Sequence, residues 1–300
     1  MATPRLITLS DGVAEAAVAP DLGGGLASYD LVTADRRTAL FRPCRDLSCA
    51  GPFDLANNLL VPWSNRISGG GFHFGGRFYP LKPNLPGEPC PIHDNGFSSP
   101  WSVESAAAER VELSLTSNGP GPFCYEARAT YSLDAGALNM WLWLRNVGTE
   151  TLPFGLGFHP WLVRTPDTLL QAKAKRVVLE NSDHLPDGEA PVASRVGWDF
   201  AASRALPADW INNAFLGWDG RATIIWSDRD LALEVEGDGP LSTYIVYSPS
   251  ARADFFCFEP VTHPVDAHNR PGGPAANGLT ILAPQETVSA TCRFCPRRLN

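Results

Sequence analysis

The segment Tyr125-Glu-Ala-Arg-Ala-Thr-Tyr-Ser-Leu133 alternates between apolar and polar residues, and after Asp134-Ala-Gly136 a second segment, Leu138-Asn-Met-Trp-Leu-Trp-Leu144, does the same. Alternation with a period of two places one set of side chains on each face of a β-strand. The three residues between the segments have the types and the length of a hairpin turn. The sequence therefore predicts two antiparallel neighbouring strands here.

Similar runs elsewhere predict many more short strands, whereas signals for helices are few. No long segment keeps apolar residues at i, i+3, i+4 and i+7, which argues against a Rossmann fold or an α/β barrel. Three hundred residues can form one large all-β domain. We therefore predict an all-β fold, a large antiparallel β-sandwich, with residues 1–300 as a single domain. The further predicted strands are 111–116, 222–226, 231–236, 243–247, 255–258, 279–282 and 287–294.

The composition excludes several classes of protein. A net charge of −8 and a pI near 5.2 argue against a nucleic-acid partner, which usually requires a basic face. No stretch approaches the ~18 apolar residues that a membrane helix needs, and the N-terminal residues lack the pattern of a secretory signal. We expect a cytoplasmic protein, a monomer or homodimer, with neither nucleic-acid nor membrane partners.

The cysteines fit the same picture. They number seven and are scattered, which suits reduced thiols better than a disulfide framework. Cys292 and Cys295 have a CxxC spacing, but a structural zinc site would need two more ligands close by. We predict that both are ordinary residues of a terminal strand.

Four segments are expected to be poor in regular structure, and loops of this kind often contain functional residues because a rigid sheet holds them in place. They are 49–71, 83–100, 181–191 and 262–277.

In and beside these loops lie four motifs. The first two are Pro62-Trp-Ser-Asn-Arg-Ile67, followed by a Gly-rich turn and an aromatic run, and Pro91-Ile-His-Asp-Asn-Gly-Phe-Ser-Ser-Pro-Trp101. The others are Phe154-Gly-Leu-Gly-Phe-His-Pro-Trp161 and Phe256-Cys-Phe-Glu-Pro-Val-Thr-His-Pro-Val-Asp-Ala-His-Asn269. In this order, and over nearly the whole chain, they resemble the aldose 1-epimerase (galactose mutarotase) family.

The resemblance implies the supersandwich fold of the galactose mutarotases and interconversion of the α and β anomers of an aldose. It also implies Glu259 as the base at the C1 hydroxyl and His159 as the acid at the ring oxygen, with no cofactor and no metal. The reaction needs one proton removed and one delivered, so we expect the base and the acid on opposite sides of one sugar. Each group precedes a proline, which restricts its backbone to the extended region.

The resemblance also indicates residues that bind the sugar. His93 and Arg66 would donate hydrogen bonds to the ring and anomeric oxygens, and Asn65 and Asn212 offer both a donor and an acceptor. Trp161 is expected to contact the apolar face of the sugar. Three further aromatic residues are candidates for the same role, namely Trp63, Phe97 and Trp101.

At two positions the chain departs from the galactose mutarotases. Asn212 stands where those enzymes have an aspartate that binds sugar hydroxyls, and Ile245 stands where they have a glutamine. An amide can still bond a hydroxyl, but isoleucine cannot. Galactose itself is therefore in doubt, and a different aldose or a sugar acid is an open alternative.

Three other functions remain open. A hexose-phosphate 1-epimerase would need a clamp of basic side chains, for which Arg66, Arg77 and Lys82 are available. A glycoside hydrolase would need a second carboxylate beside Glu259, such as Asp54 or Asp219. A non-catalytic carbohydrate-binding module could keep the same fold without turnover.

The remaining histidines are expected to be structural or exposed, namely His73, His184, His263 and His268. Asp266 lies between the last two, but loop spacing alone does not establish chelating geometry, so we predict no metal site there.

Overall fold

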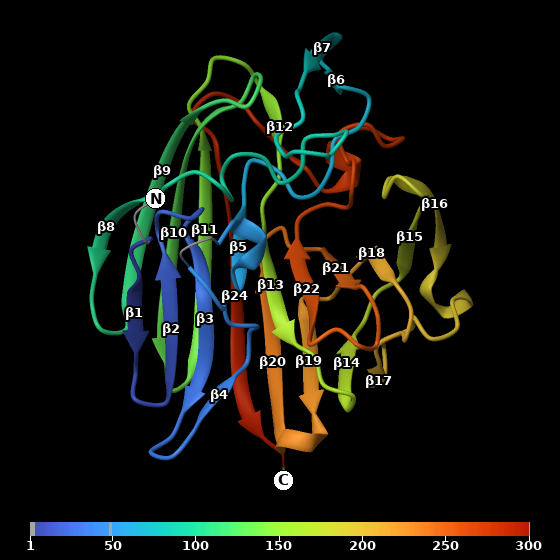
Figure 1. Cartoon of the computed structure of the whole chain (residues 1–300). Coiled ribbons are helices and arrows are strands. Elements are labelled where there is room, and N and C mark those ends of the chain that lie inside the picture. Colours follow the sequence, from blue (N-terminus) through green and yellow to red (C-terminus); the bar gives the residue numbers. More distant parts are fainter. Residues whose placement is uncertain (1–3, 48–49, 300) are drawn as a thin grey trace.

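The computed structural model describes residues 4–47 and 50–299 and contains two large β-sheets (Figure 1). The strand pairs among these residues are antiparallel. The first sheet has the order β1 (Ile7–Ser10), β2 (Ala14–Ala19), β3 (Gly25–Val32), β5 (Asn57–Leu60), β13 (Gly157–Val163), β22 (Phe255–Val261), β21 (Thr243–Ser248), β18 (Ile211–Leu216), β15 (Arg176–Glu180) and β16 (Pro186–Pro191), with β4 (Arg37–Ala39) paired to β3.

The second sheet contains nine strands, and two small two-stranded sheets complete the set. Its order is β17 (Arg204–Ala205), β14 (Thr168–Ala172), β19 (Arg221–Trp226), β20 (Leu231–Asp238), β24 (Thr287–Arg298), β11 (Ala137–Asn146), β10 (Cys124–Asp134), β9 (Arg110–Asn118) and β8 (Ser102–Ala106). The small sheets are β12 (Leu152–Phe154) with β23 (Thr280–Leu282), and β6 (Gly71–Phe74) with β7 (Arg77–Pro80). The described 3₁₀ turns are Pro52–Asp54, Val192–Ser194, Ser227–Arg229 and Ala275–Asn277.

The two sheets pack face to face over one extensive apolar core. Phe41 and Phe294 meet edge-on in it with ring centroids 5.0 Å apart. Three fully buried tyrosines join the layers, because Tyr29, Tyr131 and Tyr244 donate their hydroxyls to carbonyls of Gly136, Gly24 and Ala172. The predicted antiparallel β-sandwich is confirmed.

The hairpin predicted from the alternating segments is β10–β11. Its register pairs Asp134 with Ala137, and the two turn residues between them, Ala135 and Gly136, have positive φ angles of 48° and 86°. Positive φ at both positions is typical of a two-residue type I′ hairpin, in which glycine is favoured. The alternation and the turn chemistry therefore identified this part of the sheet correctly.

Other strand predictions are confirmed in place but not always in length. The terminal strand β24 runs to Arg298, four residues beyond the prediction, and Cys292 and Cys295 lie on it as free thiols. The loop prediction for 181–191 was wrong at its end, because Pro186–Pro191 pairs with β15 as the edge strand β16. An edge strand tolerates proline, since one side of it needs no ladder hydrogen bonds.

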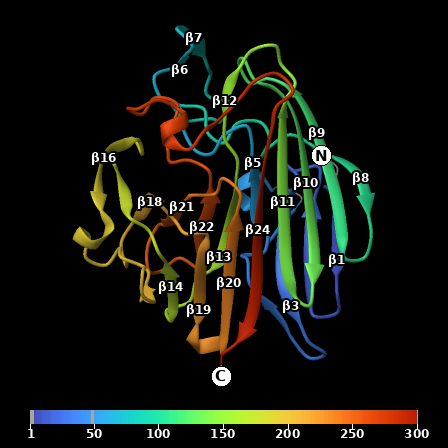
Figure 2. The same cartoon turned by 180° about the vertical axis from the view of Figure 1, so that it is seen from behind.

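Connections gather at one end of the sandwich. Figure 1 and Figure 2 show the β6–β7 hairpin and the segments around it above the upper ends of the two sheets. The segment 83–100 contains no named strand or helix, as predicted, and 262–277 contains only the short 3₁₀ turn Ala275–Asn277. The prediction for 49–71 was wrong at its centre, because Asn57–Leu60 forms β5, which pairs with β13 and β3. No helix among the described residues is both long and apolar enough to cross a membrane.

Candidate active site

The outer face of the first sheet brings together residues that are far apart in sequence. Between β13 and β22 the register pairs Trp161 with Cys257, so His159 and Glu259, two residues further along, lie opposite each other. Between β5 and β13, Asn58 pairs with His159. Partners across antiparallel strands point to the same face of a sheet. The three strands therefore present Asn58, His159 and Glu259 as one row.

His159 and Glu259 are in direct contact. His159 Nε2 lies 3.4 Å from Glu259 Oε1, and the two side chains are only 7% and 3% exposed. Their other polar atoms, His159 Nδ1 and Glu259 Oε2, are buried without a hydrogen-bond partner among the described residues. Buried polar atoms are normally paired, so two orphaned atoms in one contact pair indicate a site built for another molecule.

Burial shifts the pKa values of this pair in opposite directions. Desolvation raises the pKa of Glu259 well above its usual range and lowers the pKa of His159 to about 3. Burial therefore favours the neutral form of both side chains. The neutral pair holds the same number of protons as a carboxylate beside an imidazolium, and the two forms differ by one proton transfer across the 3.4 Å contact.

The expectation that acid and base lie on opposite sides of one sugar stays a prediction. The two groups lie side by side, with His159 Nε2 3.4 Å from Glu259 Oε1. The ring oxygen and the anomeric hydroxyl oxygen are both bonded to C1, so neighbouring groups can serve both.

His93 joins the pair from the loop after Cys90. Its ring centroid lies 5.3 Å from that of His159, and the ring is 2% exposed. The amide of Asn65 donates to His93 Nδ1 at 3.0 Å, so a neutral His93 has its proton on Nε2. Desolvation, followed by the charges of neighbouring groups, lowers the pKa of His93 well below its usual range. His93 is thus a neutral hydrogen-bond donor.

Asn65 and Arg66 have roles in the scaffold of this loop. Asn65 has a positive φ of 62°, and its Oδ1 accepts the Arg66 amide at 2.9 Å. The guanidinium of Arg66 is bound to Glu88 through two contacts of 3.0 Å. Asn65 therefore positions His93, while two donors of Arg66 are already occupied by a carboxylate.

The predicted aromatic contacts divide into two groups. Trp161 stacks on His159, with ring centroids 5.0 Å apart and planes 17° apart. Phe97 contacts His93 edge-on at 5.5 Å. Trp63 and Trp101 do not belong to the site, because both are buried in the main core between the sheets. Tryptophan has the largest apolar surface to bury, and burial in the core determined the position of both.

The upper part of the site face is closed by apolar side chains. Ile245 pairs with Glu259 across β21 and β22 and is fully buried. It belongs to a second apolar cluster, separate from the main core, in which loop residues cover the sheet. The buried members are Leu60, Phe97, Val178, Ala214, Ile245, Val261 and Val265. Burial on this face desolvates His159 and Glu259 and shifts their pKa values.

Asn212 lies near the open end of the face, on β18. Its Nδ2 donates to Glu180 at 3.0 Å, which leaves Oδ1 as the acceptor of this amide. Asn212 pairs with Tyr247 across β18 and β21. It lies two residues along β18 from Ala214, whose partner Ile245 pairs with Glu259.

The chain was compared with known proteins. A family model described as aldose 1-epimerase matches residues 5–295. The chain belongs to the aldose 1-epimerase family. It is 33% identical over 291 residues to YphB, an uncharacterized protein of Escherichia coli (strain K12), with 95% of this chain and 96% of that protein covered.

Solved structures agree with this membership. A candidate aldose 1-epimerase from Escherichia coli K12 has a TM-score of 0.90 at 31% identity, covering 98% of this chain and 99% of its own. A GalM/aldose epimerase homologue from C. elegans has a TM-score of 0.82 at 16% identity, covering 99% of this chain and 100% of its own, and supports the fold alone. The sandwich is therefore of the galactose mutarotase type.

One group of side chains could hold a metal ion, namely His159, Cys257 and Glu259. It is the only such group among the described residues. Their ligand atoms lie within 4.8 Å of one another and all three residues are buried. Desolvation raises the pKa of both Cys257 and Glu259 well above the usual values. A metal ion would therefore have to displace the protons of this thiol and this carboxyl.

His263 and His268 contact backbone groups of the neighbouring loops. Neither belongs to the metal-like group among the described residues. His263 Nε2 accepts the Ser64 amide at 3.1 Å, and its Nδ1 contacts the Pro264 carbonyl at 2.8 Å. His268 Nε2 contacts the Pro153 carbonyl at 3.1 Å. Both imidazoles brace the loops that surround the site.

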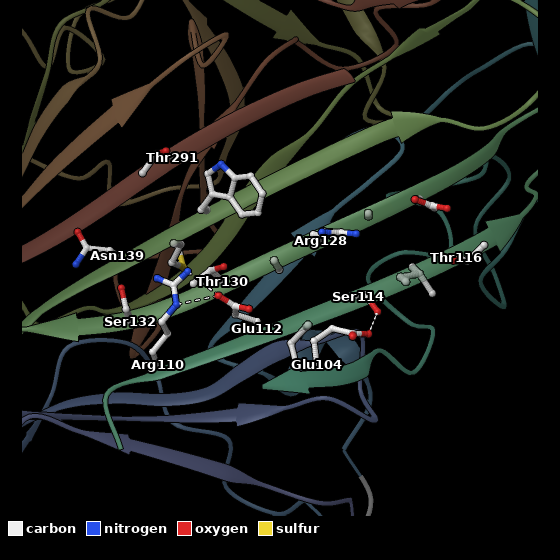
Figure 3. A pocket seen from close by; sticks show the side chains of 17 residues that line it. Glu104, Arg110, Glu112, Ser114, Thr116, Arg128, Thr130, Ser132, Asn139 and Thr291 are labelled. Carbon is white, nitrogen blue, oxygen red and sulfur yellow. Dashed lines mark hydrogen bonds and ion pairs between the residues drawn. The ribbon is translucent and has the colours of Figure 1, made fainter. Parts of the chain in front are cut away.

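A hollow of about 830 Å³ lies elsewhere, on the outer face of the second sheet. It is lined mainly by residues of β9, β10 and β11 (Figure 3). Among its polar side chains, Arg110 donates to Glu112 at 2.8 Å and Ser114 donates to Glu104 at 2.5 Å. None of its residues belongs to the family motifs, so this hollow is not the candidate active site.

Sequence reasoning missed several residues beside His159 and Glu259. Cys257 precedes Glu259 by two residues, so the alternation of β22 already placed its thiol on the site face. Arg42 stacks its guanidinium on Trp161, 4.1 Å from the ring centroid, and nothing in its sequence surroundings indicated that contact. Glu180, the partner of Asn212, lay in a segment without a motif.

Proposed function

We propose that this chain is a mutarotase that interconverts the α and β anomers of an aldose. The proposal is supported above all by the contact of 3.4 Å between His159 Nε2 and Glu259 Oε1, two buried groups that each have an orphaned polar atom. Membership of the aldose 1-epimerase family supports the same reaction.

The reaction needs only these two groups and a donor. Glu259 removes the proton from the anomeric hydroxyl, and the C1–O bond of the ring breaks as C1 becomes an aldehyde. The electron pair of that bond stays on the ring oxygen, which takes a proton from His159. Rotation about C1–C2 turns the other face of the aldehyde toward the ring oxygen, and the reverse transfers close the other anomer.

Binding of sugar prepares this proton arrangement. Burial favours the neutral pair, and ring opening starts from carboxylate and imidazolium, which differ from the neutral pair by one proton transfer. Hydroxyl groups of the sugar occupy Glu259 Oε2, and the neutral His93 donates toward the anomeric or ring oxygen. Hydrogen bonds to the charged form of a group favour that form. The sugar thus supplies hydrogen bonds that water does not supply, because the apolar cover keeps water out.

The alternatives fit the site less well. For a phosphate clamp, Arg66 is bound to Glu88 and Arg77 to Glu150, so two of the three candidates are already paired. For a glycoside hydrolase, Asp54 Oδ2 accepts the Gly51 amide and Asp219 Oδ1 accepts the Arg221 amide, each in an exposed turn. A non-catalytic module would have no use for the desolvated His159–Glu259 pair.

Polarimetry of freshly dissolved α-anomers tests the proposal. We expect acceleration of mutarotation for at least one unphosphorylated aldose without added metal or nucleotide, and a greater rate for free than for phosphorylated sugars. His159→Asn should reduce the rate by ~10²–10⁴-fold. Combining it with Glu259→Gln should cost much less than the product of the single losses, because the two groups act as a unit. Folded protein without activity on a broad panel of aldoses and sugar acids would favour the binding module.

We also propose that the protein works in the cytoplasm as a monomer or homodimer. The six cysteines among the described residues are all free thiols, which suits a reducing compartment. Cell fractionation and size-exclusion chromatography with light scattering test the two parts of this proposal separately.

A further inference from the structure

Two tryptophans stand next to each other on the outer face of the second sheet, but only one of them is covered. Trp141 and Trp143 lie two residues apart on β11, and both are partly exposed. The guanidiniums of Arg128 and Arg145 lie over the Trp143 ring, 5.5 and 5.9 Å from its centroid. Trp141 lines the hollow of about 830 Å³, and its indole has no ring, cation or hydrogen-bond partner among the described residues. The hollow therefore contains an uncovered aromatic ring.

Polar side chains without partners surround this ring. The register pairs Trp141 with Thr291 on β24, and it pairs Asn139 with Ser132 on β10 in the next row, ~7 Å away. Figure 3 shows Ser132, Asn139 and Thr291 along these three neighbouring strands. None of the three side chains has a hydrogen-bond partner in the part of the chain that the structure describes. One amide and two hydroxyls, which can each donate and accept, are thus available to a ligand.

The charged side chains of the hollow leave no strong preference for a charged ligand. Three carboxylates and two guanidiniums belong to the lining. Arg110 donates to Glu112 at 2.8 Å, and Arg145 donates to Glu126 at 2.6 Å. Arg128 lies over the neighbouring indole. An anionic ligand would compete with these carboxylates for the guanidiniums, and a cationic ligand would compete with the guanidiniums. The lining therefore favours a neutral ligand.

We propose that this hollow is a second carbohydrate site, which binds a neutral oligosaccharide. The Trp141 ring provides an apolar plane for the C–H face of one sugar unit, while Ser132, Asn139 and Thr291 exchange hydrogen bonds with its hydroxyls. The volume lies within the ~300–1,000 Å³ that is typical of ligand pockets, and the lining continues along β9 and β10, which leaves room for further units. The site lies on the opposite outer face from the candidate active site and does not depend on the proposed mutarotase function.

Isothermal titration calorimetry with neutral tetrasaccharides tests the inference. The probes are maltotetraose, cellotetraose, xylotetraose and mannotetraose, and tetragalacturonate is the anionic comparison. We expect a Kd of about 1 mM or lower for at least one neutral probe and weaker binding of tetragalacturonate. Trp141→Ala should raise this Kd by about tenfold or more, because a tryptophan at the centre of a contact provides much of the binding energy. Asn139→Ala should raise it severalfold.

Trp143→Ala is the matched control, because Trp143 is a tryptophan of the same strand and the same face whose ring is already covered by two guanidiniums. It should leave the Kd unchanged. Trp141→Phe keeps an apolar plane and should recover part of the affinity that alanine removes, which separates stacking from damage to the fold. Circular dichroism should show the same fold for all the variants.

Several outcomes would overturn the second carbohydrate site. They are no binding of any probe, a Kd that Trp141→Ala leaves unchanged, an equal loss in Trp143→Ala, and tighter binding of tetragalacturonate than of every neutral probe. A wild-type dimer that Trp141→Ala converts to a monomer in size-exclusion chromatography with light scattering would also overturn it, because a second copy of the chain would then cover the hollow.

Polarimetry judges the proposed function separately. Wild-type mutarotation by Trp141→Ala, together with lost binding of the tetrasaccharide, assigns the bound oligosaccharide to the second sheet. If no sugar is mutarotated, the mutarotase fails, and the calorimetric comparison of Trp141→Ala with Trp143→Ala still decides the second site.

Discussion

The outer faces of the two sheets have the same alternating chemistry but differ in their exposure to water. On the second sheet, Glu126 and Arg145 form an ion pair of 2.6 Å with both side chains about one-third exposed. On the first sheet, His159 and Glu259 are almost fully buried and keep two orphaned polar atoms. A hollow of about 830 Å³ lies over the second sheet, away from the family motifs, so a hollow alone does not locate the candidate site. The direct contact of two buried ionisable groups, each with an unpartnered polar atom, locates it.

The difference has a physical cause. A polar group buried without a hydrogen bond destabilises the fold, so it persists where another molecule completes its bonding. Residues of the loops 83–100 and 262–277, such as Phe97 and Val265, pack on the outer face of the first sheet. On the outer face of the second sheet, the charged side chains of β9 and β10 are partly or fully exposed. The same strand pattern thus carries buried polar groups in one place and solvent-exposed ones in the other.

The largest expected effect compares one glutamate from each outer face. Glu259→Gln keeps the shape of the side chain and removes the base, so the rate of mutarotation should fall by ~10²–10⁴-fold. Glu126→Gln, on the second sheet, should leave the rate unchanged. Polarimetry with the preferred sugar measures both. A Glu259→Gln variant close to wild-type activity would disprove the assignment of the base.

The next effect contrasts two adjacent residues that point to opposite faces of β22. Phe258 is fully buried in the main core, where its ring stacks on Tyr244 with centroids 4.8 Å apart. Phe258→Ala should lower the free energy of unfolding by ~3–5 kcal/mol through lost burial and a cavity. Glu259→Gln should not lower it, because the substitution removes a buried ionisable group. Guanidinium unfolding measures both, and a greater loss for Glu259→Gln would contradict this contrast.

A smaller effect is expected from pH, because buried histidines surround only the first sheet. Desolvation lowers the pKa of His263 to about 4 and that of His159 and His268 to about 3, and His93 is lowered too. Below about pH 6.5 the unfolded chain binds protons at these four sites that the folded protein does not, so stability falls as pH falls.

Two buried acids act in the opposite direction. Burial raises the pKa of Asp94 to about 7 and that of Glu259 well above its usual range, so each favours the fold more as pH falls. Four histidines oppose two acids. Between pH 5 and pH 6 the unfolded chain therefore binds about two protons more than the folded protein, so the free energy of unfolding falls as pH falls. Denaturant midpoints at pH 5 and pH 7 check the sign, and hydrogen exchange should show β13 and β22 losing protection before β10 and β11. Equal midpoints would contradict the expected balance.

The smallest expected effect is that of metal removal. His159, Cys257 and Glu259 have metal-like spacing, yet burial favours the protonated thiol and carboxyl. Dialysis against EDTA should therefore leave the rate of mutarotation unchanged, and Cys257→Ser should not alter that result. A loss of activity on chelation that added zinc restores would show instead that the group holds a metal.

Much of this protein followed from local patterns. Alternation and a two-residue turn predicted the β10–β11 hairpin, because the faces of a strand and the conformation of a tight turn depend on nearest neighbours in sequence. The motifs around His159-Pro160 and Glu259-Pro260 indicated the proposed acid and base, because the residues next to each of them match the family's motifs. The edge strand β16 was missed because proline and glycine weaken a strand signal, and pairing with β15 overrode it.

What only the tertiary structure decided is which partners each side chain meets. Arg66 turned out to bind Glu88, Trp63 and Trp101 to lie in the core, and Glu180 to hold Asn212 and Trp210, all through contacts between distant parts of the chain. The pKa shifts of His159 and Glu259 likewise depend on loops that close over them. Sequence alone determines the face on which a residue stands, whereas burial and partnership depend on long-range packing, which local patterns do not encode.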